Sequence, residues 1–330
     1  MMSSIENTQF IFVHGLASKP SEEKLHELWR RSLIANLSID RPDAANYLND
    51  HPESMTSAYW ANCIPDHIED SSKYVKDMSV QVDEVIKIRK KLKNELHIGK
   101  GGISKHTSKL KKFAIGIANA LGRGLTIKDN VIEKYMREVR LYHGDQYIAD
   151  RIRLPLEDAL REAWDAGKEV FLLTHSMGTF ISYDVLWRFS HRSEKEYKSY
   201  RSKKVRQFIT MGSPLGDEAL RSFMLTDRWK DAPKESLAEE RKRYFPMNIE
   251  AWYNFSAIGD VVCHDSTLED DFFKVMKDTV SQYKKADLRD YTKLYNPYVN
   301  TDGKQNPHKS YGYLIQPKLS QRICSALRHT

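Results

Sequence analysis

A serine in a turn of small residues is the most informative feature of the chain. The residues Thr174-His-Ser-Met-Gly178 follow an apolar run and precede a helical pattern. This order matches the G-x-S-x-G turn, which exposes a serine hydroxyl on a sharp strand-to-helix bend, with Thr174 in place of the first glycine. A helix that starts at Met177 directs its free N–H groups at Ser176 and favours a developing negative charge there. Ser176 is therefore the predicted nucleophile.

A serine hydroxyl is a poor nucleophile until a neutral imidazole takes its proton, so a histidine must lie beside it. In chains with this turn, an acid and then the histidine follow the serine in sequence. His308 lies in Asn306-Pro-His-Lys-Ser-Tyr311, a turn-like stretch before a helical pattern. His264 is too close to the candidate acid in sequence, and His329 is the penultimate residue. His308 is the predicted base.

The acid that orients this histidine is expected one or two strands after the turn. Asp260 follows the apolar run Trp252-Tyr-Asn-Phe-Ser-Ala-Ile and a glycine, and Val261 and Val262 come directly after it. Asp265 is the nearest alternative, and Asp217 is a more distant one at the end of the preceding predicted strand. Asp260 is the predicted acid, with Asp265 left open.

These side chains need strands to hold them, and short apolar runs predict strands at 9–13, 57–61, 169–174, 205–211 and 249–255. Helical spacing of apolar residues lies between them, at 24–37, 147–166 and 180–188. Alternating strands and helices predict an α/β fold with a mostly parallel central sheet and helices on both faces. We expect one domain over 1–330.

The stretch 66–138 does not follow this alternation. It shows two amphipathic helical patterns, one with Val82, Val85 and Ile86 and another over 110–121, and no clear strand. We interpret it as a helical insertion within the domain. As a cap it would bury its apolar stripes on the core, and as a lid it would open on a lipid surface. The pattern favours the cap and leaves the lid open.

With these residues in place, the sequence resembles the α/β-hydrolase superfamily, and most of all bacterial serine esterases and lipase-like members. The resemblance covers 9–16 and 169 to the C-terminus, and it does not cover the insertion. It implies the α/β-hydrolase fold and cleavage of an ester, thioester or amide through an acyl-enzyme intermediate, without a cofactor. We expect a carboxylic ester of a small molecule or a lipid as substrate.

The resemblance also assigns the oxyanion hole. The strand at 9–13 ends in His14-Gly15-Leu16, and in this family the residue after the glycine donates a backbone N–H to the oxyanion. Leu16 is that residue here, with the Met177 N–H as the second donor. His14, Gly15, His175 and Gly178 are expected to support the turn and the loop, and Gly15 permits close approach of the backbone.

A net charge of +7 raises the question of an anionic partner. Most of the excess positive charge lies between Lys87 and Lys112, a stretch with ten Lys or Arg residues and a single acidic residue, Glu95. Such a block is typical of a solvated helix face, and it could contact an anionic membrane through 87–121. No helix-turn-helix, zinc or aromatic-basic RNA motif accompanies the charge, so no nucleic-acid partner is expected.

The three cysteines, Cys63, Cys263 and Cys324, have neither disulfide nor metal-ligand spacing. The adjacent residues Cys263-His-Asp265 are poorly placed to converge on one ion, so no metal is expected. Reduced thiols, a polar start without the features of a signal peptide and no apolar run of membrane-spanning length favour a cytoplasmic protein.

Two other functions remain open. A fold of this class can serve as a catalytically silent scaffold that binds a partner. If the insertion is a lid, the protein could instead be a phospholipase regulated at anionic membranes. Three triad residue types in the expected order favour the hydrolase over the scaffold.

Overall fold

The computed structural model describes residues 5–16, 18–64, 67–91, 130–217, 245–263, 265–273 and 287–327. Its centre is one sheet in the order β2-β1-β3-β4-β5-β6, and every neighbouring pair of strands is parallel. The strands are β1 (Thr8–Val13), β2 (Met55–Ala58), β3 (Glu169–His175), β4 (Val205–Met211), β5 (Ala251–Ala257) and β6 (Asp287–Leu294). The predicted α/β class and parallel sheet are confirmed.

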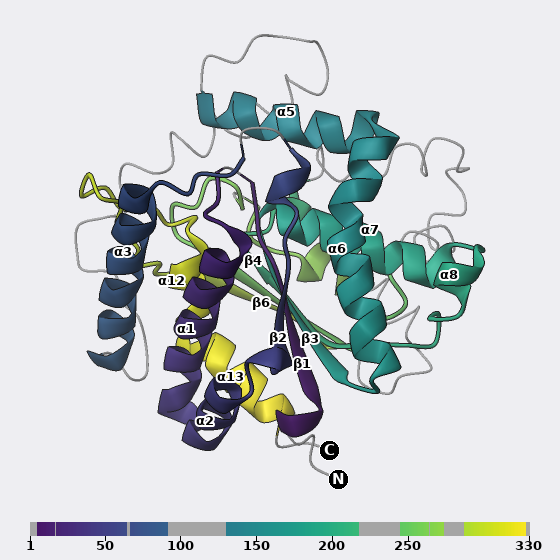
Figure 1. Ribbon diagram of the computed structural model, residues 1–330, viewed down its shortest axis with the longest axis horizontal. Coiled ribbons are helices and arrows are strands. Elements are labelled where there is room, and N and C mark those ends of the chain that lie inside the picture. Colours follow the sequence, from purple (N-terminus) through teal and green to yellow (C-terminus); the bar gives the residue numbers. More distant parts are fainter. Residues whose placement is uncertain are drawn as a thin grey trace.

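Helices cover both faces of this sheet (Figure 1). One layer contains α1 (Glu22–Asp40), α2 (Pro42–Asp50), α3 (Ser72–Lys91), α12 (Ser310–Leu314) and α13 (Pro317–Ala326). The other contains α5 (Asn130–Gly144), α6 (Gln146–Asp165), α7 (Met177–His191) and α8 (Lys195–Lys198). Short 3₁₀ turns are η1 (Ile5–Asn7), η2 (Pro52–Ser54), η3 (Ala61–Cys63) and η4 (Pro214–Gly216).

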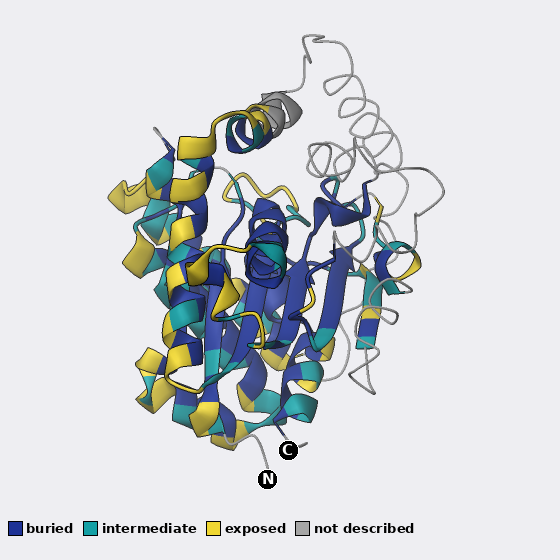
Figure 2. Ribbon diagram, turned by 90° about the vertical axis from the view of Figure 1, so that its right-hand side faces the viewer, coloured by how far each residue is buried: buried dark blue, intermediate teal, exposed yellow. Residues whose placement is uncertain are grey.

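Alternation along each strand builds two cores. In β1, Phe10 and Phe12 pack under α1, whereas Ile11 and Val13 face α6 and α7. The four inner strands, β1, β3, β4 and β5, are buried on both faces, whereas the helices carry exposed residues on their outer sides (Figure 2). Burial on both faces explains why the sequences of these four strands are mostly apolar and do not alternate with polar residues.

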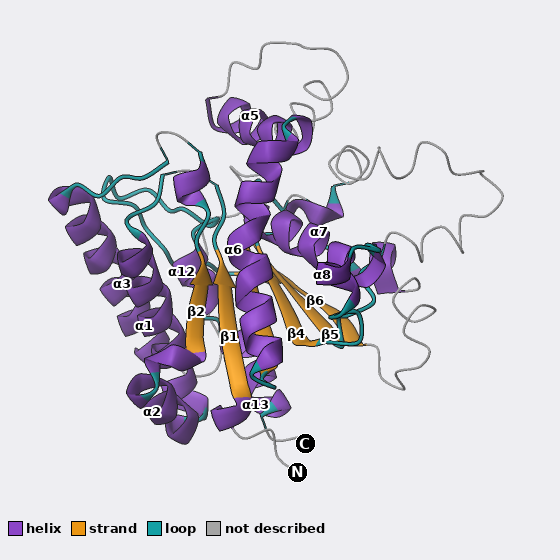
Figure 3. Cartoon of the chain, turned by 45° about the vertical axis from the view of Figure 1, so that its right-hand side comes forward, coloured by secondary structure: helices purple, strands orange, loops and turns teal. Residues whose placement is uncertain are grey.

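The strand ends define where a site can form. All strands run in one direction, so their C-terminal ends share one edge of the sheet, and both chain termini lie toward the opposite edge (Figure 3). In open α/β sheets, ligands bind outside the C-terminal edge of the strands. Ser176 and Asp260 both follow strands at this edge.

The described part of the insertion does not form a separate layer over the sheet. Helix α3 packs beside α1 and α12, and its buried residues Met78, Val82 and Val85 belong to the core under α1. Within the basic block, Arg89 is fully buried and donates to Asn36 Oδ1 at 2.7 Å and to Asp40. This arginine is therefore a structural group and does not face solvent.

The remaining insertion residues, 92–129, lie outside the described residues, and with them the second predicted helix and most of the segment 87–121. Helix α5 packs on α6 and extends beyond the C-terminal edge of the strands (Figure 3). In the described part of the chain, no helix combines the length and apolar character needed to cross a membrane.

Candidate active site

Ser176 stands between β3 and α7 with φ 54° and ψ −127°. Such angles are strained for a residue with a side chain and persist only where the surroundings enforce them. Here the Ser176 N–H donates to the carbonyl of Met211 on β4 at 3.0 Å, and its own carbonyl accepts from the Thr179 hydroxyl at 2.7 Å. The sheet on one side and the first helical turn on the other therefore hold the bend.

Two glycines make room for this bend. A Cβ on Gly178 would lie 2.5 Å from the Val13 carbonyl oxygen, and one on Gly15 would lie 2.5 Å from Cβ of Ser176. Neither position accommodates a side chain, because real Cβ atoms do not approach other atoms so closely. The close contact of β1, its following loop and α7 therefore depends on both residues.

Thr174 occupies the position of the first glycine in the turn pattern. Its side chain is fully buried, and its hydroxyl donates to the carbonyl of Ile209 on β4 at 3.0 Å. The hydroxyl is thus satisfied inside the sheet, and the branched side chain is compatible with a strand. This contact explains why threonine is tolerated there.

The structure brings the three predicted side chains into one hydrogen-bonded chain. Nε2 of His308 lies 2.9 Å from the Ser176 hydroxyl oxygen, and Nδ1 lies 2.9 Å from each carboxylate oxygen of Asp260. Since the carboxylate can only accept, the proton belongs on Nδ1, which leaves Nε2 free to accept from the serine. This is the tautomer that a general base needs.

Asp260 is fully buried and receives two further hydrogen bonds. The Tyr313 hydroxyl donates to Oδ2 at 2.6 Å, and the Val262 N–H donates to Oδ1 at 3.0 Å. Burial by itself would raise the pKa of Asp260, but the charge of His308 and these hydrogen bonds outweigh it and hold the pKa below its ordinary value. The carboxylate is therefore ionised when it contacts the imidazole.

Two residues of this site were not selected from the sequence. Tyr313 lies on α12, and its hydroxyl donates a hydrogen bond to Asp260. Gly212 directly follows β4 and has a φ of 56°. A Cβ on Gly212 would lie 2.8 Å from Asp260 Oδ2 and 3.0 Å from His308 Nδ1. The Gly-Ser-Pro sequence after a strand was the only signal for Gly212, and nothing in the local sequence marks Tyr313.

The alternative acids lie elsewhere. Asp265 is exposed, and its Oδ1 accepts from the Thr267 hydroxyl at 3.3 Å. Asp217 is buried at the end of η4 after β4. The structure brings Asp260, rather than either of these, to His308; the alternative bases His264 and His329 lie outside the described residues.

His14 braces the loop after β1. It stacks on Trp60 with ring centroids 4.7 Å apart, its Nδ1 donates to the Gly15 carbonyl, and its Nε2 accepts from the Trp60 N–H. Burial, with a smaller contribution from the charge of Lys19, lowers the pKa of His14 to about 3. This imidazole is therefore a neutral structural group.

His175 holds the loop that carries the base. Its Nε2 donates to the His308 carbonyl oxygen at 2.6 Å, and the two rings lie 4.7 Å apart. Burial, followed by the charge of His308, lowers the pKa of His175 well below its ordinary value. A second cation beside His308 is thereby avoided.

The predicted oxyanion donors lie in two neighbouring segments, the start of α7 and the loop after β1. Met177 is the first residue of α7, so its N–H is one of the free donors at a helix start, and Leu16 is in the loop held by His14 and Gly15. The Leu16 carbonyl accepts from the ammonium of Lys19, which ties that loop down. Both segments meet at Gly15, whose Cα packs against Ser176.

A cavity of about 580 Å³ opens beside these groups. Ser176, His308 and Leu16 line it on one side, and Leu25, Trp29 and Met78 line it from α1 and α3. Pockets of several hundred cubic ångströms with apolar walls and a few polar groups are typical of small-molecule sites. The first helix of the insertion therefore contributes a wall of the cavity.

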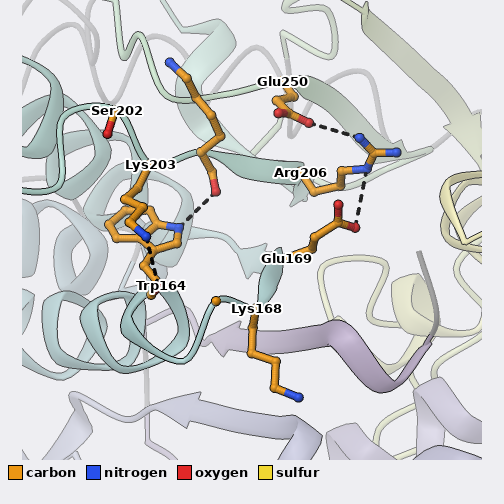
Figure 4. A pocket seen from close by; sticks show the side chains of 9 residues that line it. Trp164, Lys168, Glu169, Ser202, Lys203, Arg206 and Glu250 are labelled. Atoms are coloured by element: carbon orange, nitrogen blue, oxygen red, sulfur yellow. Dashed lines mark hydrogen bonds and ion pairs between the residues drawn. The ribbon is translucent and has the colours of Figure 1, made fainter. Parts of the chain in front are cut away.

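A smaller hollow of about 220 Å³ lies near the start of β3 and β4 (Figure 4). Its charged groups make structural contacts: Arg206 lies between Glu169 and Glu250, and Lys203 donates to the Trp164 carbonyl. Within the described residues, no group of three or more His, Cys, Asp or Glu side chains could hold a metal ion.

Comparison of the chain with protein-family models, curated proteins and solved structures finds no match.

Proposed function

We propose that the protein is a serine hydrolase of the α/β-hydrolase type that cleaves a carboxylic ester through an acyl-enzyme intermediate. The observation that carries this proposal is the chain of 2.9 Å contacts from Ser176 through His308 to Asp260, at a strained strand-to-helix bend beside a cavity. A serine, a base and an orienting acid in hydrogen-bond contact are the parts that nucleophilic catalysis requires.

The first half-reaction begins at the serine hydroxyl. Its oxygen attacks the ester carbonyl carbon while Nε2 of His308 takes its proton, and Asp260 stabilises the resulting imidazolium. The carbonyl oxygen becomes an oxyanion, which the N–H groups of Leu16 and Met177 bind. Collapse of this intermediate breaks the bond to the alcohol oxygen, and the alcohol leaves with the proton from His308.

The second half-reaction restores the serine. Water attacks the acyl carbon of the acylated Ser176 and gives its proton to Nε2 of His308, and the acid product leaves as the serine oxygen regains that proton. The apolar walls formed by Leu25, Trp29 and Met78 suit a small-molecule or lipid ester with an acyl chain. No step requires a cofactor.

A cytoplasmic location belongs to the same proposal. All three cysteines are free thiols, and Cys263 and Cys324 are buried. Burial raises the pKa of the Cys263 thiol well above its ordinary value, which keeps it protonated and unreactive. Free, inert thiols are typical of proteins in a reducing compartment.

Turnover of nitrophenyl esters of increasing acyl length tests the function. We expect hydrolysis by the wild type and a loss of about a thousandfold or more in Ser176→Ala. Ser182→Ala is the matched control, because Ser182 lies on α7 with a buried hydroxyl that has no hydrogen-bond partner among the described residues. Undiminished turnover by Ser176→Ala would contradict Ser176 as the nucleophile. No turnover by the wild type would contradict the hydrolase and favour the binding scaffold.

A further inference from the structure

The cavity beside Ser176 carries two lysines that the hydrolytic mechanism does not use. Lys19 lines it from the segment between β1 and α1, and Lys309 lines it directly after His308. Both are partly exposed. Among the described residues that line the cavity, none is Asp or Glu. The described part of the wall thus carries two positively charged side chains and no negatively charged one.

These charges act on the site itself. After burial and the charge of His308, the positive charges of Lys19 and Lys309 further lower the pKa of His175, which directly precedes the nucleophile. Burial lowers the pKa of Lys309, and the negative charge of Glu69 opposes this effect. A partly desolvated ammonium interacts more strongly with an opposite charge than one in bulk water does.

The two lysines have different structural roles. The ammonium of Lys19 donates to the Leu16 carbonyl and so helps to fix the loop of the predicted oxyanion donor. The ammonium of Lys309 lies 5.6 Å from the centroid of the Tyr298 ring, whose face attracts a cation and orients it. Lys309 is therefore the lysine whose charge can be tested without disturbing the loop at Leu16.

The deeper wall is apolar. Leu25, Trp29 and Met78 are each less than 5% exposed and present a hydrophobic surface from α1 and α3. Buried apolar side chains below partly exposed lysines give the cavity an amphiphilic lining. An anionic group on the substrate would complement the ammonium charge that Lys309 brings to the rim of the cavity.

We propose that the preferred ester carries an anionic group, a carboxylate or a phosphate, on an apolar chain, with the anion at Lys309 and Lys19 and the chain against Leu25, Trp29 and Met78. This inference rests on the proposed hydrolytic function and names its substrate class. The scissile ester carbonyl remains at Ser176, and the anionic group is separate from it.

Binding to Ser176→Ala tests the inference without turnover. Calorimetry would compare monomethyl suberate with dimethyl suberate, which differ in one negative charge at the same chain length. We expect the anion to bind about tenfold more tightly or better. Methyl 6-(phosphonooxy)hexanoate places its phosphorus at the same distance along the chain as the carboxylate carbon of monomethyl suberate. It distinguishes a phosphate site from a carboxylate site by which anion binds more tightly.

Variants of Lys309 in the Ser176→Ala background assign the effect. Lys309→Met should abolish the preference for the anion, and Lys309→Arg should retain it. Lys304→Met is the matched control and should retain it too, because Lys304 pairs with Asp302 on the exposed turn before this loop. Equal affinities for the two suberates, or a preference that survives in Lys309→Met, would overturn the inference whether or not Ser176 is the nucleophile.

Discussion

The carboxylate of Asp260 is held from several sides, and each contact contributes to the direction in which the imidazole of His308 points. Tyr313 and the Val262 N–H donate to it, and Gly212 leaves the space in which the Asp260–His308 pair lies. The geometry of the proposed base therefore depends partly on Tyr313 and Gly212, neither of which lines the cavity.

Gly212→Ala should lower kcat/KM about a hundredfold. The added Cβ would lie 2.8 Å from Asp260 Oδ2 and 3.0 Å from His308 Nδ1, and a displacement of that pair by a fraction of an ångström misaligns the base. Gly167→Ala is the control. It has a comparable positive φ of 70° with nothing within 4 Å, so it should cost about 1 kcal/mol of stability and no activity.

Tyr313→Phe should lower kcat about tenfold with little change in KM, because the lost hydroxyl binds Asp260 and does not line the cavity. Tyr253→Phe removes a similar bond, to Asp287 at 2.8 Å, outside the site, and should leave kcat unchanged. Steady-state kinetics of both variants would decide the matter. Equal kcat values would show that Tyr313 has no positioning role.

The sequence was informative about single residues only where chemistry and local pattern coincide. Ser176 could be selected because a nucleophilic serine needs a small-residue bend after a strand, and His308 because few histidines follow the candidate acid. Tyr313 could not, because its role arises only when α12 packs below the end of β5, where its hydroxyl also accepts from the Ala257 N–H. That contact joins residues far apart in the sequence, so no local sequence pattern predicts it.

At the scale of elements, the site depends on how closely α7 approaches β1. Gly178 lies at that crossing, where a Cβ would meet the carbonyl oxygens of Val13 and His14. The same crossing brings the start of α7 beside the loop at Leu16. Helix, strand and loop thus share one close contact.

Gly178→Ala should lower the free energy of unfolding by about 3 kcal/mol and abolish activity. A Cβ there would lie 2.5 and 2.6 Å from two backbone oxygens, which cannot move as a side chain can. Gly144→Ala is the control, because Gly144 ends α5 and an added Cβ would meet no described residue within 4 Å, so the change should be tolerated. Urea unfolding measures both, and equal stabilities would show that the crossing is loose.

Most strands could be predicted from the spacing of apolar residues along the sequence. The predicted strand 205–211 has the same bounds as β4. The predicted strand 57–61 was shifted, because β2 ends at Ala58 and the chain turns at Trp60 to stack on His14. Strand β6 was missed: Asp287-Leu-Arg-Asp-Tyr-Thr-Lys-Leu294 is a charged edge strand, of which only Leu288 is fully buried. An edge strand has one neighbour and does not need a continuous apolar run.

At the scale of the whole molecule, the site is assembled from distant parts of the chain, and buried neutral histidines lie at its centre. His14 is neutral in the fold down to about pH 3, whereas an ordinary histidine takes up a proton near pH 6.5. Unfolding therefore binds a proton below pH 6.5. The contribution of His14 to stability is complete above that pH and is lost as the pH falls toward about 3.

Stability should accordingly decrease in mild acid. Between about pH 7.5 and pH 5, His14 alone should account for a loss of about 2 kcal/mol in the free energy of unfolding. His14→Gln removes the titrating group, so its stability should depend less on pH by that amount. Urea unfolding at both pH values provides the comparison, and parallel pH profiles of the two proteins would contradict a buried neutral His14.

Covalent labelling of the full chain by a fluorophosphonate probe, located by peptide mass spectrometry, tests the central claim most directly. The account predicts one adduct, on Ser176, formed by the wild type and by Ser182→Ala, and absent from Ser176→Ala and His308→Ala because the hydroxyl needs its base. An unlabelled Ser176 in the wild type, or labelling that is undiminished in Ser176→Ala, would contradict it.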